Sequence, residues 1–231
     1  MFRLRSALFG IGLLASAAGL LRAEESRVLC LTDNIHARMV AQPLARELGK
    51  DVKVEIPRNG PNDSGTAIAE LDTLLGETKW DVIYFNYGIG ELFYKDPATQ
   101  EIRAMSKNAG GVRVATPEQY GKNLDELVKR LKATGAKLLW GTTTPLVNVH
   151  SFPSYQGNLF DADSEVEYNS IAAAVMKRHG VPVVDVHAHV MAQFGPDEKH
   201  PGFASYDKTL NQKDKSPVHE PVVRAIRSSL K

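Results

Sequence analysis

Cysteine is almost absent from this sequence, with one residue, Cys30, in a chain of 231. A single cysteine cannot form an intramolecular disulfide, so no disulfide framework holds the fold. Cys30 lies inside an apolar run, and we therefore interpret it as a small buried hydrophobic residue, not as a reactive thiol.

An excess of charge of either sign is also lacking, because 28 basic residues stand against 27 acidic ones. Proteins that bind nucleic acid carry a basic surface, so we expect no nucleic-acid partner. No break in composition, internal repeat or low-complexity tract divides the chain. Its length suits one sizeable α/β domain.

The first residues differ from the rest. Arg3 and Arg5 precede an apolar run at 7–21, and Ala23 ends a short small-residue segment after it. This order is typical of a secretory signal peptide, so we predict a signal at 1–23 and one domain at 24–231. The alternative is a membrane anchor, but the run is short and glycine-rich for a membrane span. We expect a periplasmic or secreted protein with no membrane partner after cleavage.

Short apolar runs alternate along the chain with helical patterns or long loops. This alternation predicts a parallel sheet covered by helices on both faces, a three-layer α/β/α fold of the flavodoxin-like type with five strands. The five runs lie at 28–31, 52–56, 81–85, 137–142 and 181–186.

Helix signals fill the intervals between these runs. Thr116 is followed by proline, glutamate and glutamine, which offers an N-cap and a proline at the first helical position. Ser164 and Glu167 repeat the capping pattern, and we expect the buried face of that helix to contain Val166, Ile171, Val175 and Met176. A helix at 37–48 should end at Gly49, and another is expected at 65–75.

Polar residues follow several of the predicted strands. In a parallel sheet the carboxyl ends of the strands meet at one edge, where ligands bind. We therefore expect a ligand site formed by residues from separate loops. They are Asp33, Asn34, Asn59, Gly60, Asn86, Thr143, Thr144, His187 and His189.

The same edge offers a candidate metal site. Asp185, His187 and His189 alternate, so on an extended segment they would share a face and could bind a metal ion. No further cysteine or carboxylate completes the set. We therefore expect neither a metal nor another cofactor.

The order of these segments resembles the SGNH or GDSL hydrolase superfamily, and more closely its exported bacterial branch. Gly60 falls at the oxyanion glycine of that family, and Asn86 falls at its oxyanion asparagine within Tyr84-Phe85-Asn86-Tyr87-Gly88. His219, before a final amphipathic segment, falls at the catalytic histidine. The resemblance implies an α/β/α fold and ester hydrolysis, in particular deacylation of a carbohydrate.

Two departures from the family pattern bear on catalysis. Asn34, after Thr32 and Asp33, stands at the nucleophile position, and a carboxamide has no hydroxyl for a histidine base to activate. Ser216 and Pro217 occupy the two registers of the orienting aspartate. A histidine that lacks such a carboxylate loses its preferred tautomer unless a backbone carbonyl or the nearby Asp214 replaces it.

These departures leave three hypotheses. The first is an exported SGNH-fold protein that binds an acylated glycan or a small molecule without serine hydrolysis. The second is an active ester hydrolase in which Ser64, or a water held by Asp33 and His219, attacks the substrate. The third is a scaffold that shares only the fold.

Simpler roles also stay open for the single residues. Asn34 could serve only as a helix N-cap, and Gly60 only for its backbone conformation. His219 could simply close the loop onto the last helix.

Overall fold

The computed structural model describes residues 25–146, 164–195 and 217–231. The predicted signal peptide at 1–23 and Ser216 lie outside the described residues.

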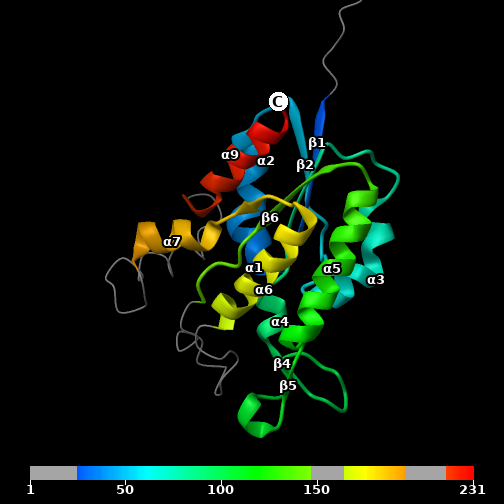
Figure 1. The fold of residues 1–231 in the computed structure, drawn as a ribbon, viewed down its shortest axis with the longest axis vertical. Coiled ribbons are helices and arrows are strands. Elements are labelled where there is room, and N and C mark those ends of the chain that lie inside the picture. Colours follow the sequence, from blue (N-terminus) through cyan, green and yellow to red (C-terminus); the bar gives the residue numbers. More distant parts are fainter. Residues whose placement is uncertain (1–24, 147–163, 196–216) are drawn as a thin grey trace, which may run out of the picture.

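A five-stranded parallel sheet forms the centre of the molecule, as predicted (Figure 1). The strand order is β2-β1-β3-β6-β7, which places β1 and β3 inside the sheet. The last strand is shorter than expected because Asp185 begins a helix directly after it. The strands are β1 (Ser26–Thr32), β2 (Val52–Glu55), β3 (Val82–Asn86), β6 (Lys137–Gly141) and β7 (Val183–Val184).

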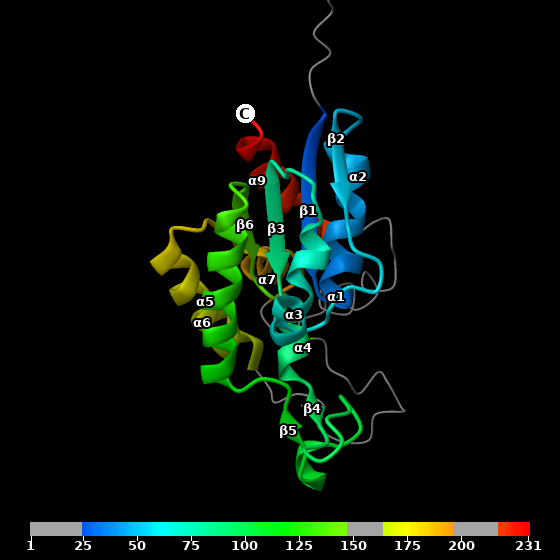
Figure 2. The ribbon, with the colours of Figure 1, turned by 90° about the vertical axis from the view of Figure 1, so that its right-hand side faces the viewer.

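Helices cover both faces of this sheet (Figures 1 and 2). One face packs against α3 (Ser64–Leu75), α5 (Pro117–Ala133) and α6 (Ser164–His179). The other face packs against α2 (Gln42–Leu48), α7 (Val186–Phe194) and α9 (Glu220–Ser229). The predicted three-layer α/β/α class is therefore confirmed.

The alternation of side chains along β1 explains why its apolar run is continuous. Leu29 and Leu31 point into the core on one face, and Val28 and Cys30 into the core on the other. Cys30 is fully buried, and burial raises the pKa of its thiol to about 12. It is a buried hydrophobic residue, as expected.

The segment after β1 is helical but not uniform. A short α1 (Asn34–His36) passes into a π-helix, η1 (Ala37–Ala41), and then into α2, which ends at Gly49 with φ +92°. The sequence predicted one helix over 37–48 and did not distinguish the wider π turn. The helix after Thr116 agrees with prediction, because the Thr116 hydroxyl accepts a hydrogen bond from the Gln119 amide at 3.2 Å.

The structure differs from the sequence pattern at two places. Val166, expected on the inner face of α6, is 51% exposed and Glu165 beside it is buried, although Val175 and Met176 are buried as predicted. The segment after β3 also contains regular structure that no periodic pattern indicated. It comprises α4 (Ile89–Leu92), an antiparallel pair of β4 (Tyr94–Lys95) and β5 (Val112–Arg113), and the turn η2 (Lys107–Ala109).

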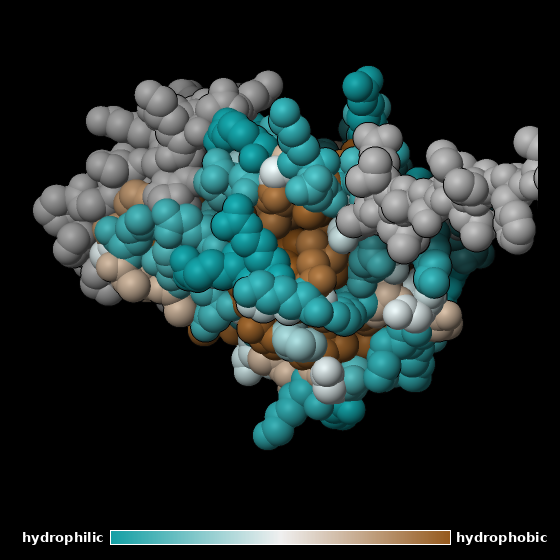
Figure 3. All heavy atoms as spheres, turned by 90° about the horizontal axis from the view of Figure 1, so that it is seen from above, coloured by the Kyte–Doolittle hydropathy of each residue, from teal (hydrophilic) through white to brown (hydrophobic). Residues whose placement is uncertain are grey.

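The two ends of the sheet differ. Seen from the end where β1 begins, a band of hydrophobic residues lies between hydrophilic ones (Figure 3). The β4–β5 pair lies beyond the opposite end, where the strands finish (Figure 2). In the part of the chain that the structure describes, no helix has the length and hydropathy needed to cross a bilayer.

Candidate functional site

The carboxyl ends of β1, β3 and β6 are joined directly by hydrogen bonds. The Asp33 amide donates to the Asn86 carbonyl at 3.3 Å, and the Asn86 side chain donates to the Thr143 hydroxyl at 3.2 Å. Three of the polar segments expected at this edge therefore lie together. They form the floor of the candidate site.

Asp33 is the N-cap of the helix after β1. Its Oδ1 accepts hydrogen bonds from the amides of Ile35 (3.0 Å) and His36 (2.9 Å). Burial raises the pKa of this carboxyl to about 6, while those amides and the amides of Gly88 and Ile89 lower it. Asp33 thus joins the start of α1 to the start of α4, and the alternative that Asn34 provides the N-cap is wrong.

Asn34 lies one residue further on and is exposed. Its backbone amide donates to the side-chain oxygen of Asn62 at 3.1 Å, and Asn62 lies in the loop between β2 and α3. The nucleophile position of the resemblance is therefore open to solvent. It presents a carboxamide and an amide N–H that already has an acceptor.

Asn86 is fully buried at the end of β3. Its Nδ2 donates to the Gly141 carbonyl at 2.9 Å and to the Thr143 hydroxyl at 3.2 Å. A carboxamide has two N–H hydrogens, so both are used inside the protein, while Oδ1 has no donor. An oxyanion could be stabilised by Asn86 only if it displaced one of these acceptors.

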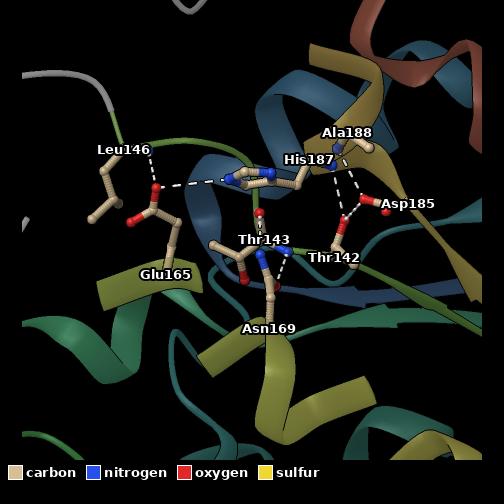
Figure 4. A network of polar contacts seen from close by, with 8 residues as sticks. All are labelled: Thr142, Thr143, Leu146, Glu165, Asn169, Asp185, His187 and Ala188. Carbon is tan, nitrogen blue, oxygen red and sulfur yellow. Dashed lines mark hydrogen bonds and ion pairs between the residues drawn. The ribbon is translucent and has the colours of Figure 1, made fainter. Parts of the chain in front are cut away.

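Thr143 is held against Asn86 from two directions. Gly88 makes room for it, since a Cβ at Gly88 would lie 1.8 Å from the Thr143 hydroxyl oxygen. On the other side, the Asn169 side chain accepts from the Thr143 amide and donates to its carbonyl, both at 2.8 Å (Figure 4). This wall of the site is therefore rigidly placed by α6.

Gly60 lies half-buried in the loop between β2 and α3. The left-handed residue of this turn is Asn59, with φ +54°, and not Gly60. A Cβ at Gly60 would make only an ordinary contact, at 3.4 Å from the Pro57 side chain. Backbone conformation alone therefore does not require glycine here, and the bond between Asn62 and Asn34 ties this loop to the end of β1.

Ser64, the alternative nucleophile, is the first residue of α3 and is fully buried. Its hydroxyl oxygen accepts from the Asn123 side chain at 2.9 Å, and its amide donates to Glu91. A nucleophile must reach its substrate, so this burial argues against attack by Ser64.

Glu91 is a buried carboxyl that the sequence analysis missed. It is fully buried in α4, and burial raises its pKa to about 8, although bonds from Ser64 oppose the shift. Its Oε2 has no hydrogen-bond partner. The available signal was a single glutamate between apolar residues in the segment that follows Asn86.

His219 is 8% exposed and lies in a short turn, η4 (Pro217–His219), directly before α9. This turn packs against the π-helix Ala37–Ala41 and against α7. The carboxyl-terminal segment therefore lies beside the helix that begins at Asn34. Asp214 and Ser216 are outside the described residues.

His187 and His189 do not form the extended face considered for a metal. Both lie in α7, where side chains two residues apart point in different directions. His187 instead faces Glu165, with 3.8 Å between its Nε2 and Oε1 (Figure 4). Over residues 25–146, 164–195 and 217–231, no group of three metal-donor side chains occurs.

Thr142 and Asp185 fix the start of α7. The Asp185 carboxylate accepts from the Ala188 amide at 2.9 Å and from the Thr142 hydroxyl at 3.1 Å. The Thr142 oxygen in turn accepts from the His187 amide at 2.9 Å (Figure 4). These contacts extend the polar edge from β6 to β7 and serve to anchor the helix.

Comparison with known sequences places the chain in a family. Residues 25–207 match the GDSL-like Lipase/Acylhydrolase family. The chain belongs to this family. Asp33, Asn34, Gly60 and Asn86 lie within the matched residues, whereas His219 lies beyond them.

Solved structures share this fold at low sequence identity. LAE5, an alpha/beta hydrolase enzyme from the metagenome of Lake Arreo, is 18% identical, with a TM-score of 0.56 over 88% of this chain and 94% of its own. The lipase/acylhydrolase from Enterococcus faecalis is 15% identical, with a TM-score of 0.56 over 88% and 96%. The acetyl xylan esterase AlAXEase is 11% identical, with a TM-score of 0.54 over 88% and 97%. No curated protein matches the chain.

Proposed function

We propose that this GDSL-family protein is exported and binds an acylated ligand, in particular an acylated glycan, without serine-type hydrolysis. The observation that carries the proposal is the exposed Asn34 directly after the buried Asp33. The position that should hold the attacking hydroxyl is accessible but holds a carboxamide. A carboxamide cannot form an acyl-enzyme by the serine route.

The surrounding contacts support binding over catalysis. Both hydrogens of the Asn86 side chain are bonded to the protein, and Ser64 is buried against Asn123 and Glu91. The second hypothesis, an active hydrolase with a rearranged site, lacks an accessible hydroxyl at Ser64. Asp33 is 2% exposed, so a solvent water has little access to its carboxylate.

The class of ligand is argued from the fold and from relatives. Structures that share the fold include a lipase/acylhydrolase and an acetyl xylan esterase, and both names describe proteins that act on acyl groups. An acetylated glycan outside the cytoplasm also agrees with the predicted signal at 1–23. We propose no cofactor and no nucleic-acid partner.

Calorimetry with acetylated xylo-oligosaccharide, run beside the same oligosaccharide after chemical deacetylation, tests the proposal. The acetylated form should bind more tightly, and NMR should detect no enzyme-dependent release of acetate. A fluorophosphonate should leave the protein unlabelled. Equal binding of the two forms would contradict acyl recognition. Acetate release, or labelling that Ser64→Ala abolishes, would instead establish an active hydrolase.

A further inference from the structure

The bond between Asn34 and Asn62 lies at the surface of the candidate site. The Asn34 amide donates to the Asn62 side-chain oxygen at 3.1 Å, and both residues are exposed. A carboxamide oxygen is a neutral carbonyl acceptor, the same chemical group as the acyl oxygen of an ester or an N-acyl sugar. A side chain of the protein therefore supplies an acyl-type oxygen to this amide.

The backbone of Asn62 is fixed although its side chain is exposed. A Cβ at Gly90 would lie 1.7 Å from the Asn62 carbonyl oxygen, so the two backbones touch there. The next residue, Asp63, caps α3 by accepting from the Thr66 amide and hydroxyl at 2.9 and 2.8 Å. Release of the Asn34 amide therefore needs only a rotation of the Asn62 side chain.

The other expected donor at this edge is already used. Asn86 is fully buried, and its two hydrogens bond Gly141 and Thr143. A ligand oxygen can replace the exposed acceptor of Asn34 at much lower cost than a buried acceptor of Asn86, because exposed hydrogen bonds exchange readily with water. The Asn34 amide is thus the better receptor for a ligand oxygen.

We propose that the carboxamide oxygen of Asn62 occupies, in the unliganded protein, the position on the Asn34 amide that the acyl oxygen of a ligand takes. This inference rests on the proposed acyl-binding function. Asn62 is then a specificity residue that any ligand must displace, and only a group able to accept from the same N–H can do so.

The neighbouring charge selects among such groups. Asp33 directly precedes Asn34, and its pKa of about 6 leaves its carboxylate ionised at pH 8. A ligand carboxylate at the Asn34 amide would be repelled, whereas an ester or N-acyl oxygen is neutral. The site therefore favours neutral acyl groups over free acids such as acetate.

The test uses NMR titration of the mature protein at pH 8 with acetylated xylo-oligosaccharide. In Asn62→Ala the Asn34 amide should shift and exchange faster with water, and the affinity should rise by about two- to tenfold, the worth of one exposed hydrogen bond. Asn62→Asp keeps an acceptor and adds charge, so its affinity should fall below that of the parent. Glu70→Gln, an exposed change on α3, is the control and should bind like the parent.

Each result decides a different claim. Higher affinity in Asn62→Ala alone, with a ligand-induced shift at Asn34, supports the inference. Unchanged affinity in Asn62→Ala, or binding that leaves the Asn34 amide unperturbed, overturns it while the proposed function stands. Acetate competing as well as the acetylated oligosaccharide overturns the selectivity. Absence of binding by every variant overturns both the inference and the proposed function.

Discussion

The Glu91 carboxylate accepts a hydrogen bond from the backbone amide of Ser64, and both residues are fully buried. Burial raises the pKa of Glu91 from its ordinary 4.5 to about 8. Between those values the folded protein holds a proton that the unfolded chain has released. The free energy of unfolding therefore falls as pH rises through this range.

The contribution of Glu91 to the pH dependence of stability can be measured separately above pH 6.5. Asp33, with a pKa of about 6, is mostly ionised by then, so little of its own change remains. Urea unfolding from pH 6.5 to 8 should show a loss of stability on the order of 1–2 kcal/mol, and Glu91→Gln should remove it. The exposed Glu70→Gln on the same side of the sheet is the control and should keep the parent's slope. A steep slope in Glu91→Gln would contradict the assignment.

His36 should produce the opposite trend in acid. Its Nε2 lies 2.6 Å from the Tyr84 hydroxyl, and burial lowers its pKa from 6.5 to about 3. The unfolded chain therefore binds a proton below pH 6.5 that the folded protein excludes, and stability falls as pH decreases toward 3. NMR of the imidazole should show no titration of His36 between pH 8 and 5. A midpoint near 6.5 would show that the ring is solvated.

Gly88 should resist substitution because of Thr143. A Cβ at Gly88 would lie 1.8 Å from the Thr143 hydroxyl oxygen, so Gly88→Ala should destabilise the fold by about 1–3 kcal/mol. Thr143→Ala in the same chain should recover part of that loss. Gly121→Ala is the control, since its Cβ would lie 3.4 Å from Ile171 in a helix, where alanine is favourable. Thermal unfolding of the parent, both single variants, the double variant and Gly121→Ala measures these differences, and additive losses at positions 88 and 143 would argue against the contact.

A hydroxyl at position 34 should restore some hydrolysis if the match to the family is correct. Asn34→Ser combined with Pro217→Asp should raise cleavage of p-nitrophenyl acetate above the parent's rate. The gain should be modest, because a triad gives its full effect only when every member is oriented. Asn34→Ala with the same aspartate is the control without a hydroxyl. Equal rates in the serine and alanine variants would reject position 34 as the nucleophile site.

Export predicts a defined mature terminus. Protein isolated from its source cell should begin near Glu24, because Ala23 ends a signal-like segment. Intact-mass analysis with amino-terminal peptide mapping decides this. A mature species that retains Met1 would remove the proposed localisation.

The sheet and the principal helices could be predicted because their signals are local. Apolar runs of four or more residues and the Thr116 capping pattern do not depend on distant contacts. Two-residue strands such as β4 and β5 are too short to show an alternation of apolar and polar residues, so no sequence pattern predicts them. Asp33 and Asn34 are both good N-caps, and only the structure identifies Asp33 as the one that caps.

The contacts that define the site were harder to predict because they join separate loops. Asn62 is 28 residues from Asn34, and Glu91 is 27 residues from Ser64. No feature of the local sequence predicts either contact. The resemblance aligned Asn86 with an oxyanion donor, but the partners of its hydrogens, Gly141 and Thr143, became visible only in the folded chain.

The π turn Ala37–Ala41 sets the rotational phase of α2 relative to Asn34. Each residue of an α-helix advances the side chains by about 100°, so one residue more or less in this turn would rotate the rest of the helix by that angle. Leu44 and Leu48 now face the core while the Asn34 amide faces Asn62. The π turn lies between these two contacts and sets their relative rotation. The over-wide turn thus lets the core and the site be built from one continuous helix.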